Sequence, residues 1–250
     1  MIDSKGVQGG PRGSDEWSQV IFGAGPGLGV SIARRFAAEG FRIALVARRK
    51  DRLDALVDQL SAEGIDTAGF TADLSAPKEI PALIEAIRER FGQIDVVEYG
   101  PVPSVRFTPA AELDPDTLAQ GIPLLLLTPL AVVQAVLPEW KKRGNGAFLM
   151  TTGATAVQPM PHASGVGPLM AAARNWLYSL NGELTESGIY AGTLSIAAFI
   201  GGSEAAEAAG ASEPTAAFPV VAPADLAALY WDMYTKRDRV EEVPPALKAD

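Results

Sequence analysis

Short apolar runs that alternate with longer segments of helical periodicity constrain the fold of this chain more than any other feature. The runs predict buried strands at Val20–Phe22, Arg42–Val46, Ala68–Phe70, Ile94–Val97, Ala147–Thr151 and Gly192–Ile196. The periodic segments predict helices at Ser31–Glu39, Arg52–Glu63, Pro77–Phe91, Leu124–Trp140, Ser164–Glu186 and Ala224–Tyr234. Strands that alternate with helices are typical of repeated βαβ units. The pattern therefore predicts an α/β protein with a doubly wound parallel sheet.

One domain is expected over residues 17–250, because 250 residues of which 48% are hydrophobic suffice for one sizeable core. Residues 1–16 are rich in glycine, poor in apolar residues and without a signal-peptide core, so we predict a flexible tail there. No uninterrupted apolar run approaches the roughly 18 residues that a membrane-spanning helix needs. We therefore expect a cytoplasmic protein that does not bind membranes.

Charge and residue usage exclude several classes of function. With 21 basic and 30 acidic residues, the net charge of −9 disfavours nucleic acid and anionic lipid as partners. The chain has no cysteine and one histidine, which excludes thiolate sites and histidine-based metal sites. We predict no metal and a small molecule as the binding partner.

Two segments depart from simple helical periodicity. Pro123 and Pro129 lie at the start of the Leu-rich helical run, and a proline inside a helix costs about 3 kcal/mol, so this helix should start late or kink. The segment Gly201–Ala217 is rich in Ala, Gly, Ser and Glu. It suits a mobile loop or short helices over a pocket.

A glycine-rich loop follows the first predicted strand directly and leads into a helix. Its sequence is Gly23-Ala24-Gly25-Pro26-Gly27-Leu28-Gly29. Glycines allow a sharp turn and a close approach to a pyrophosphate, which then accepts hydrogen bonds from free amides at the helix N-terminus. The strand, loop and helix context predicts a nucleotide site of the Rossmann type, to which we assign Gly23, Gly25, Gly27, Leu28 and Gly29.

Arg48 and Arg49, at the end of the second predicted strand, bear on the choice of cofactor. An acidic residue there would bind the ribose 2′-hydroxyl of NAD, but the sequence has no acid at this point. A guanidinium matches the 2′-phosphate of NADP(H) in charge and shape, although these cations could instead lie at a solvated helix start. Asp73 and Leu74 follow the third strand, where Asp73 could accept a hydrogen bond from the adenine amine.

Polar residues also end the fourth and fifth predicted strands. Thr151 or Thr152 could bind a substrate or the nicotinamide amide, or could form a turn. Tyr99 could line the pocket or donate a proton. Glu98 could pair with a cationic substrate or with a nearby arginine.

The order of these features resembles the short-chain dehydrogenase/reductase family from about Gln19 to Tyr234. The residues that carry the resemblance are Gly23, Gly27, Gly29, Asp73, Ile94–Val97 and Gln134–Pro138. The resemblance implies a single-domain Rossmann fold of about seven strands, a cytoplasmic enzyme, and a homodimer or homotetramer built on the long helices.

The family's catalytic tetrad of Asn, Ser, Tyr and a Lys four residues after the Tyr has no counterpart here. Our alignment places Leu125 or a neighbour at the first of these positions, and Gly153, His162 and Val166 at the other three. His162, expected at the start of a helix, could act as a general acid near neutral pH, or could be a helix-cap or pocket-wall residue. We take His162, Thr152 and Tyr99 as the candidate catalytic residues.

Three functions remain open on the sequence. The first is an NADPH-dependent reductase of an activated C=N or C=O bond, because a protonated imine is already activated and needs no Tyr-Lys pair. The second is a nucleotide-binding sensor or assembly subunit without hydride transfer. The third is a redox-neutral cyclase or lyase.

Overall fold

The computed structural model describes residues 17–101, 108–203, 206 and 219–247. The tail expected at residues 1–16 and most of the segment expected to cover a pocket lie outside these ranges.

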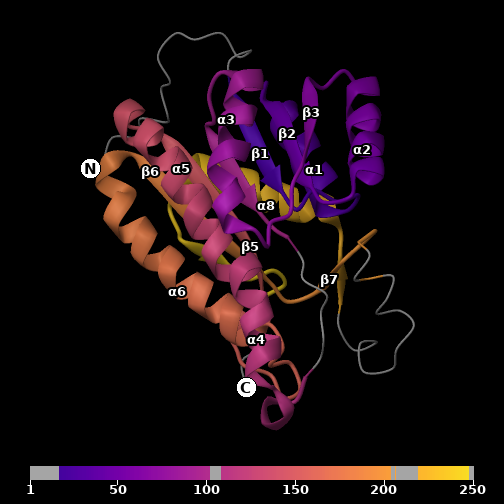
Figure 1. The fold of residues 1–250 in the computed structure, drawn as a ribbon, viewed down its shortest axis with the longest axis vertical. Coiled ribbons are helices and arrows are strands. Elements are labelled where there is room, and N and C mark those ends of the chain that lie inside the picture. Colours follow the sequence, from indigo (N-terminus) through magenta and orange to yellow (C-terminus); the bar gives the residue numbers. More distant parts are fainter. Residues whose placement is uncertain (1–16, 102–107, 204–205, 207–218, 248–250) are drawn as a thin grey trace.

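A seven-stranded sheet with the order β3-β2-β1-β4-β5-β6-β9 forms the centre of the protein (Figure 1). All six pairings are parallel, which confirms the predicted doubly wound α/β fold. The strands are β1 (Ser18–Phe22), β2 (Arg42–Ala47), β3 (Thr67–Thr71), β4 (Val96–Tyr99), β5 (Gly146–Gly153), β6 (Ile189–Ile196) and β9 (Glu241–Glu242). The order reverses between β1 and β4, and ligands of such sheets bind at the carboxyl ends of the strands beside this point.

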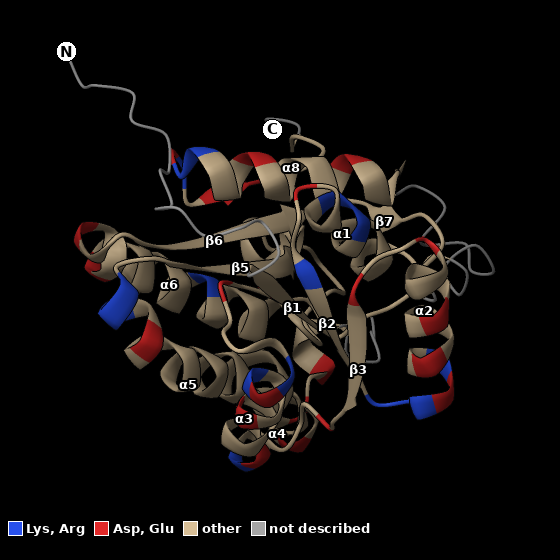
Figure 2. Cartoon of the chain, turned by 90° about the horizontal axis from the view of Figure 1, so that it is seen from above, with Lys and Arg blue, Asp and Glu red and all other residues tan. Residues whose placement is uncertain are grey.

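Helices cover both faces of the sheet (Figure 2). One layer holds α1 (Leu28–Ala37), α2 (Lys50–Ala62) and α8 (Pro223–Lys236), and the other holds α3 (Ile80–Phe91), α5 (Thr128–Arg143) and α6 (Gly167–Leu184). Each layer buries its own hydrophobic cluster against the sheet. In Figure 2 the basic and acidic residues are mixed along the outer faces of the helices.

Four short elements, namely β7 (Phe199–Ile200), β8 (Val220–Val221), β9 and α4 (Pro115–Ile122), were not predicted by the periodicity. Strand β9 is a pair of glutamates that extends the sheet beyond β6. A separate pair of parallel strands, β7 and β8, lies beside the main sheet. Helix α4 is capped by Asp114, whose carboxylate accepts a hydrogen bond from the Asp116 amide at 2.8 Å.

The predicted disturbance around the prolines is present. Pro123–Leu127 form a π-helical segment between α4 and α5, and Pro129 is the second residue of α5, where it has no amide to donate to the preceding turn. The helical run therefore begins earlier than predicted, and it changes from α-helical to π-helical geometry at Pro123.

Because these segments join, Pro115–Arg143 forms one 29-residue helical run of mean hydropathy 1.9, long and apolar enough to cross a membrane by length and composition. The sequence prediction considered only uninterrupted apolar runs and did not foresee it. In the structure, α5 packs on the sheet through Val132, Val136 and Trp140, each fully buried. A core helix of a soluble protein can also meet these criteria of length and hydropathy.

Candidate active site

Gly23 opens the loop between β1 and α1 and needs to be glycine. Its φ is +83°, and an added Cβ would lie 2.5 Å from the Cα of Pro101. The amides of Gly23 and Ala24 both donate to the carbonyl oxygen of Val46 at 2.9 Å. The loop is thereby tied to the ends of both β2 and β4.

The rest of the loop leaves room above a helix start. Gly29 packs on Ala24, since an added Cβ would lie 3.1 Å from the Cα of that residue, and a Cβ added at Gly27 would lie 3.3 Å from the carbonyl oxygen of Gly201. Among the described residues, no atom lies within 4 Å of a Cβ added at Gly25. Helix α1 begins at Leu28 without an acidic residue in its first turn or a side-chain cap. Its first amides are therefore suited to an anion.

The residues predicted to bind the rest of a nucleotide follow β2 and β3 at the same edge of the sheet. Arg48 and Arg49 are exposed directly after β2, and Arg49 is the N-cap of α2. Asp73 is exposed, and its Oδ1 accepts a hydrogen bond from the Ser75 amide at 2.9 Å. Leu74 is buried, and its carbonyl oxygen accepts from the Thr128 hydroxyl at 2.7 Å. Both arginines and the Asp73 carboxylate thus reach solvent.

Tyr99, a candidate catalytic residue, lies inside the core and does not line an open site. Its side chain is 1% exposed, and its hydroxyl donates to the carbonyl oxygen of Leu124 at 2.5 Å. Burial raises the pKa of this phenol well above its usual value. Its position in the core fits neither predicted role, that of a residue lining the pocket or that of a proton donor.

Thr152, the second candidate, belongs to a buried polar network on the α6 face of the sheet. Its hydroxyl lies 2.8 Å from that of Ser195, which donates to Glu241 at 2.6 Å. Arg174 on α6 and Tyr178 also donate to this carboxylate, the former from Nε at 2.8 Å. The network holds β9 against β6 and occupies the hydroxyl of Thr152.

Thr151 points to the opposite face and makes contacts that the sequence did not reveal. Its hydroxyl donates to Oε1 of Glu98 at 2.7 Å and lies 2.6 Å from the hydroxyl of Tyr230 on α8. Glu98 is 2% exposed, and burial, opposed by the bond from Thr151, raises the pKa of its carboxyl to about 8. No cation lies within ion-pair distance of Glu98 in the described part of the chain, so the prediction that a nearby arginine pairs with Glu98 is wrong.

His162, the third candidate, does not start a helix. It lies in an exposed turn with φ +64°, and α6 begins five residues later at Gly167. The prolines at 159, 161 and 168 delay the helix, which the periodicity placed at Ser164. The side chain that α6 brings to Gly153 is Met170, whose Sδ accepts from the Gly153 amide at 3.3 Å.

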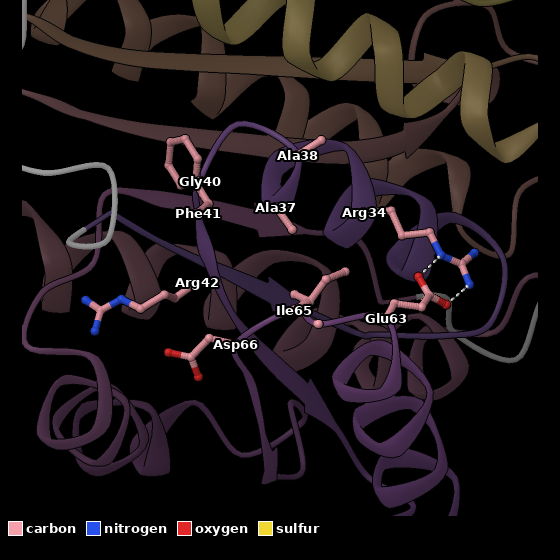
Figure 3. Close-up of a pocket in the computed structure, with 10 residues that line it drawn as sticks. Arg34, Ala37, Ala38, Gly40, Phe41, Arg42, Glu63, Ile65 and Asp66 are labelled. Atoms are coloured by element: carbon pink, nitrogen blue, oxygen red, sulfur yellow. Dashed lines mark hydrogen bonds and ion pairs between the residues drawn. The ribbon is translucent and has the colours of Figure 1, made fainter.

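Two further observations delimit the site. In the described residues, no group of three or more His, Asp or Glu side chains converges in a way that could hold a metal. A pocket of about 770 Å³ lies at the amino edge of the sheet, lined by residues that include Phe41, Asp66 and the ion pair of Arg34 with Glu63 (Figure 3). It is at the opposite end of the strands from every predicted site residue.

Comparison with known proteins identifies a family model that matches this chain and several proteins of similar sequence. The model described as short chain dehydrogenase matches residues 19–199. A putative ketoacyl reductase of granaticin polyketide synthesis from Streptomyces violaceoruber is 33% identical over 54% of this chain and 50% of that protein. A fatty acyl-CoA reductase from Mycobacterium tuberculosis is 29% identical over 52% of this chain and 45% of that protein. The chain matches about half the length of these curated relatives.

Solved structures share the fold at lower identity. An NADPH-bound short chain oxidoreductase from Pseudomonas aeruginosa, described as containing an atypical catalytic center, superposes with a TM-score of 0.80 at 17% identity, over 95% of this chain and 98% of that one. A metagenomic short-chain oxidoreductase in complex with NADP gives 0.76 at 20% identity, over 93% and 99%.

Proposed function

The chain belongs to the short-chain dehydrogenase family, and from this premise we propose that it is an NADP(H)-dependent reductase whose site lacks the family's usual proton donor. The observation that carries the proposal is the carboxyl edge of the sheet. There the open space over Gly25 and the bare N-terminus of α1 adjoin the exposed Arg48 and Arg49. This donor set suits a dinucleotide with an additional phosphate.

Each part of the nucleotide has a matching group on this edge. The pyrophosphate would lie over Gly25 and Gly27, the 2′-phosphate would lie beside Arg48 and Arg49, and the adenine amine would donate to Asp73. Leu74 would pack near the adenine. When bound, the cofactor supplies a hydride to an electrophilic carbon.

The substrate follows from what the site lacks. The positions aligned with the family's Tyr and Lys hold His162, which lies in an exposed turn, and Val166, which does not titrate. Leu125 lies in the π-helical segment, and Gly153 has no side chain. We therefore infer that any proton comes from a group other than the family's Tyr-Lys pair, and that the substrate is an activated C=N or C=O bond of a small molecule. The atypical center described for the Pseudomonas relative supports such a departure within this fold.

Cofactor preference gives the first test. NADPH should bind more tightly than NADH in a fluorescence titration. Arg48→Asp should weaken NADPH by about 10- to 100-fold, the value of a lost charge-assisted hydrogen bond, with little effect on NADH. Lys142→Asp, which changes a basic residue in the last turn of α5, is a charge-matched control and should leave both affinities unchanged. Equal affinity of the parent for both nucleotides would contradict the assignment.

A substrate screen gives the second test. NADPH consumption should be measured against cyclic imines, iminium salts, ketones and enones, and we expect turnover with the iminium salts first. If NADPH binds but no substrate is reduced, the sensor reading or the redox-neutral cyclase or lyase replaces the reductase.

Location in the cytoplasm and assembly stay predictions. We propose a homodimer or homotetramer that binds neither nucleic acid nor membranes, and light scattering should give at least twice the chain mass of 26.2 kDa.

A further inference from the structure

Glu98 is a buried carboxyl, and no contact in the described part of the chain explains why this position holds an acidic residue. Its neighbours across the sheet are Ile21 on β1 and Leu149 on β5, both apolar. Within the described ranges, the hydroxyl of Thr151 is the only hydrogen-bond donor that contacts it. A buried carboxylate with one neutral donor is strongly disfavoured, so the group holds its proton.

The backbone beside Glu98 is shaped to admit the carboxyl at the edge of the site. A Cβ at Gly100 would lie 2.5 Å from Oε1 of Glu98 and 2.9 Å from Oγ1 of Thr151. Gly100 donates its amide to Phe22 at 3.0 Å, and the next residue, Pro101, contacts Gly23 of the cofactor loop. The carboxyl and the hydroxyl therefore lie beneath the junction of the cofactor loop with the end of β4.

Thr151 differs from Glu98 in that it is only partly buried. The two oxygens are 2.7 Å apart, and Tyr230, fully buried on α8, holds the hydroxyl of Thr151 from the other side at 2.6 Å. Glu98, Thr151 and Tyr230 thus form a row of oxygens in which the two outer residues are buried and the middle residue, Thr151, is the most accessible. Tyr230 fixes the position of the threonine hydroxyl.

We propose that the carboxyl of Glu98 stores the proton of the reduction and that the hydroxyl of Thr151 delivers it to the substrate. This proposal rests on the proposed reductase function. As the carbonyl carbon accepts a hydride from the reduced nicotinamide, the C=O π pair moves to oxygen, which takes the proton of Thr151. For this delivery the hydrogen bond between the two groups is reversed, so that the protonated carboxyl of Glu98 donates to Oγ1 of Thr151, and Thr151 takes the proton of Glu98 in the same step. The carboxylate is reprotonated from solvent, so one ketone, one NADPH and one proton give one alcohol and one NADP⁺.

A purely structural role for the row would hold α8 against the sheet and nothing more. It predicts that substitutions change stability without distinguishing between substrates or altering a pH profile. Delivery of a proton predicts that they matter only where the substrate needs one. An N-methylated cyclic iminium, whose charge is permanent and whose product is a tertiary amine, needs none.

The test compares Glu98→Gln and Thr151→Val with the parent, using a ketone and an N-methylated cyclic iminium with NADPH. We expect each variant to lower ketone turnover about 100-fold or more, as for loss of a general acid, and to change iminium turnover by less than about 5-fold. In the parent, ketone turnover should fall as the pH rises through about 8, and this limb should vanish in Glu98→Gln. Thr193→Val removes a buried hydroxyl on the other face of the sheet and should leave both rates unchanged.

A second readout does not depend on turnover. With carbon-13-labelled glutamate, one carboxyl resonance should titrate near pH 8, respond to NADPH and be absent from Glu98→Gln. Titration in the ordinary acid range, or equal loss of both activities in the two variants, would overturn the proton store while leaving the reductase intact. A 100-fold loss of ketone turnover in His162→Asn, with full activity in Glu98→Gln, would move the role to His162. A parent that reduces neither substrate would overturn the function itself, whatever the resonance does.

Discussion

Replacing Gly25 by valine should abolish NADPH binding and leave the fold intact. No atom of the described residues lies within 4 Å of a Cβ at this position, and the backbone of Gly25 is not in the left-handed region, so the described part of the protein has room for a side chain. The space that the side chain would fill is where a pyrophosphate has to approach the amides of α1. We expect NADPH affinity to fall by at least about 100-fold, or roughly 3 kcal/mol. Fluorescence titration and a thermal melt would measure the two effects separately.

Gly182→Ala is the matched control for this experiment. Gly182 is exposed on α6 and has no atom within 4 Å of an added Cβ. The variant should bind NADPH as the parent does and gain about 0.5–1 kcal/mol of stability, because alanine is the better helix residue. Gly23→Val would be uninformative, since its side chain collides with Pro101 and breaks the loop. Undiminished binding in a folded Gly25→Val variant would show that the nucleotide does not cross this loop.

The parts of the fold that could be predicted are those fixed by local patterns. Six strands were found because each contains a short apolar run between turn residues, although β3 is only partly buried, and the cofactor loop was found because its glycines follow a strand and precede a helix. Strand β9 has no such pattern. Its Glu241 is held by Arg174 on α6 and Ser195 on β6, far away in the sequence. Only the assembled sheet reveals that a pair of glutamates extends it.

For the candidate site too, some residues could be predicted from the sequence and others could not. Arg48, Asp73 and the glycines could be placed at one edge because they follow successive parallel strands. The partner of Glu98 could not, since Thr151 lies 53 residues away and Tyr230 another 79. The position of His162 depended on where α6 begins, which the nearby prolines decide. Predictions from the sequence therefore failed for helix ends and for long-range polar contacts.

Glu98→Gln should make the protein more stable at alkaline pH and change its stability little at acid pH. The folded state binds the proton of Glu98 more tightly than the unfolded state does, because burial raises the pKa from 4.5 to about 8. The parent's stability from this group is therefore complete below pH 4.5 and is lost as the pH rises to about 8. At about 1.4 kcal/mol per pKa unit, the variant should gain up to roughly 5 kcal/mol over the parent across this window. Urea unfolding at pH 5, 7 and 9 measures the difference.

Glu241→Gln supplies a control of opposite sign. Burial opposes ionisation of Glu241, but hydrogen bonds from Arg174, Ser195 and Tyr178 outweigh it and lower its pKa. The stability that this carboxylate contributes is present above its unfolded pKa and is lost as the pH falls through the folded one. Glu241→Gln should therefore be less stable than the parent at pH 7, with a gap that narrows toward acid pH. If Glu98→Gln differs from the parent by the same amount at pH 5 and 9, Glu98 titrates normally, and the buried row of oxygens does not hold a proton at neutral pH.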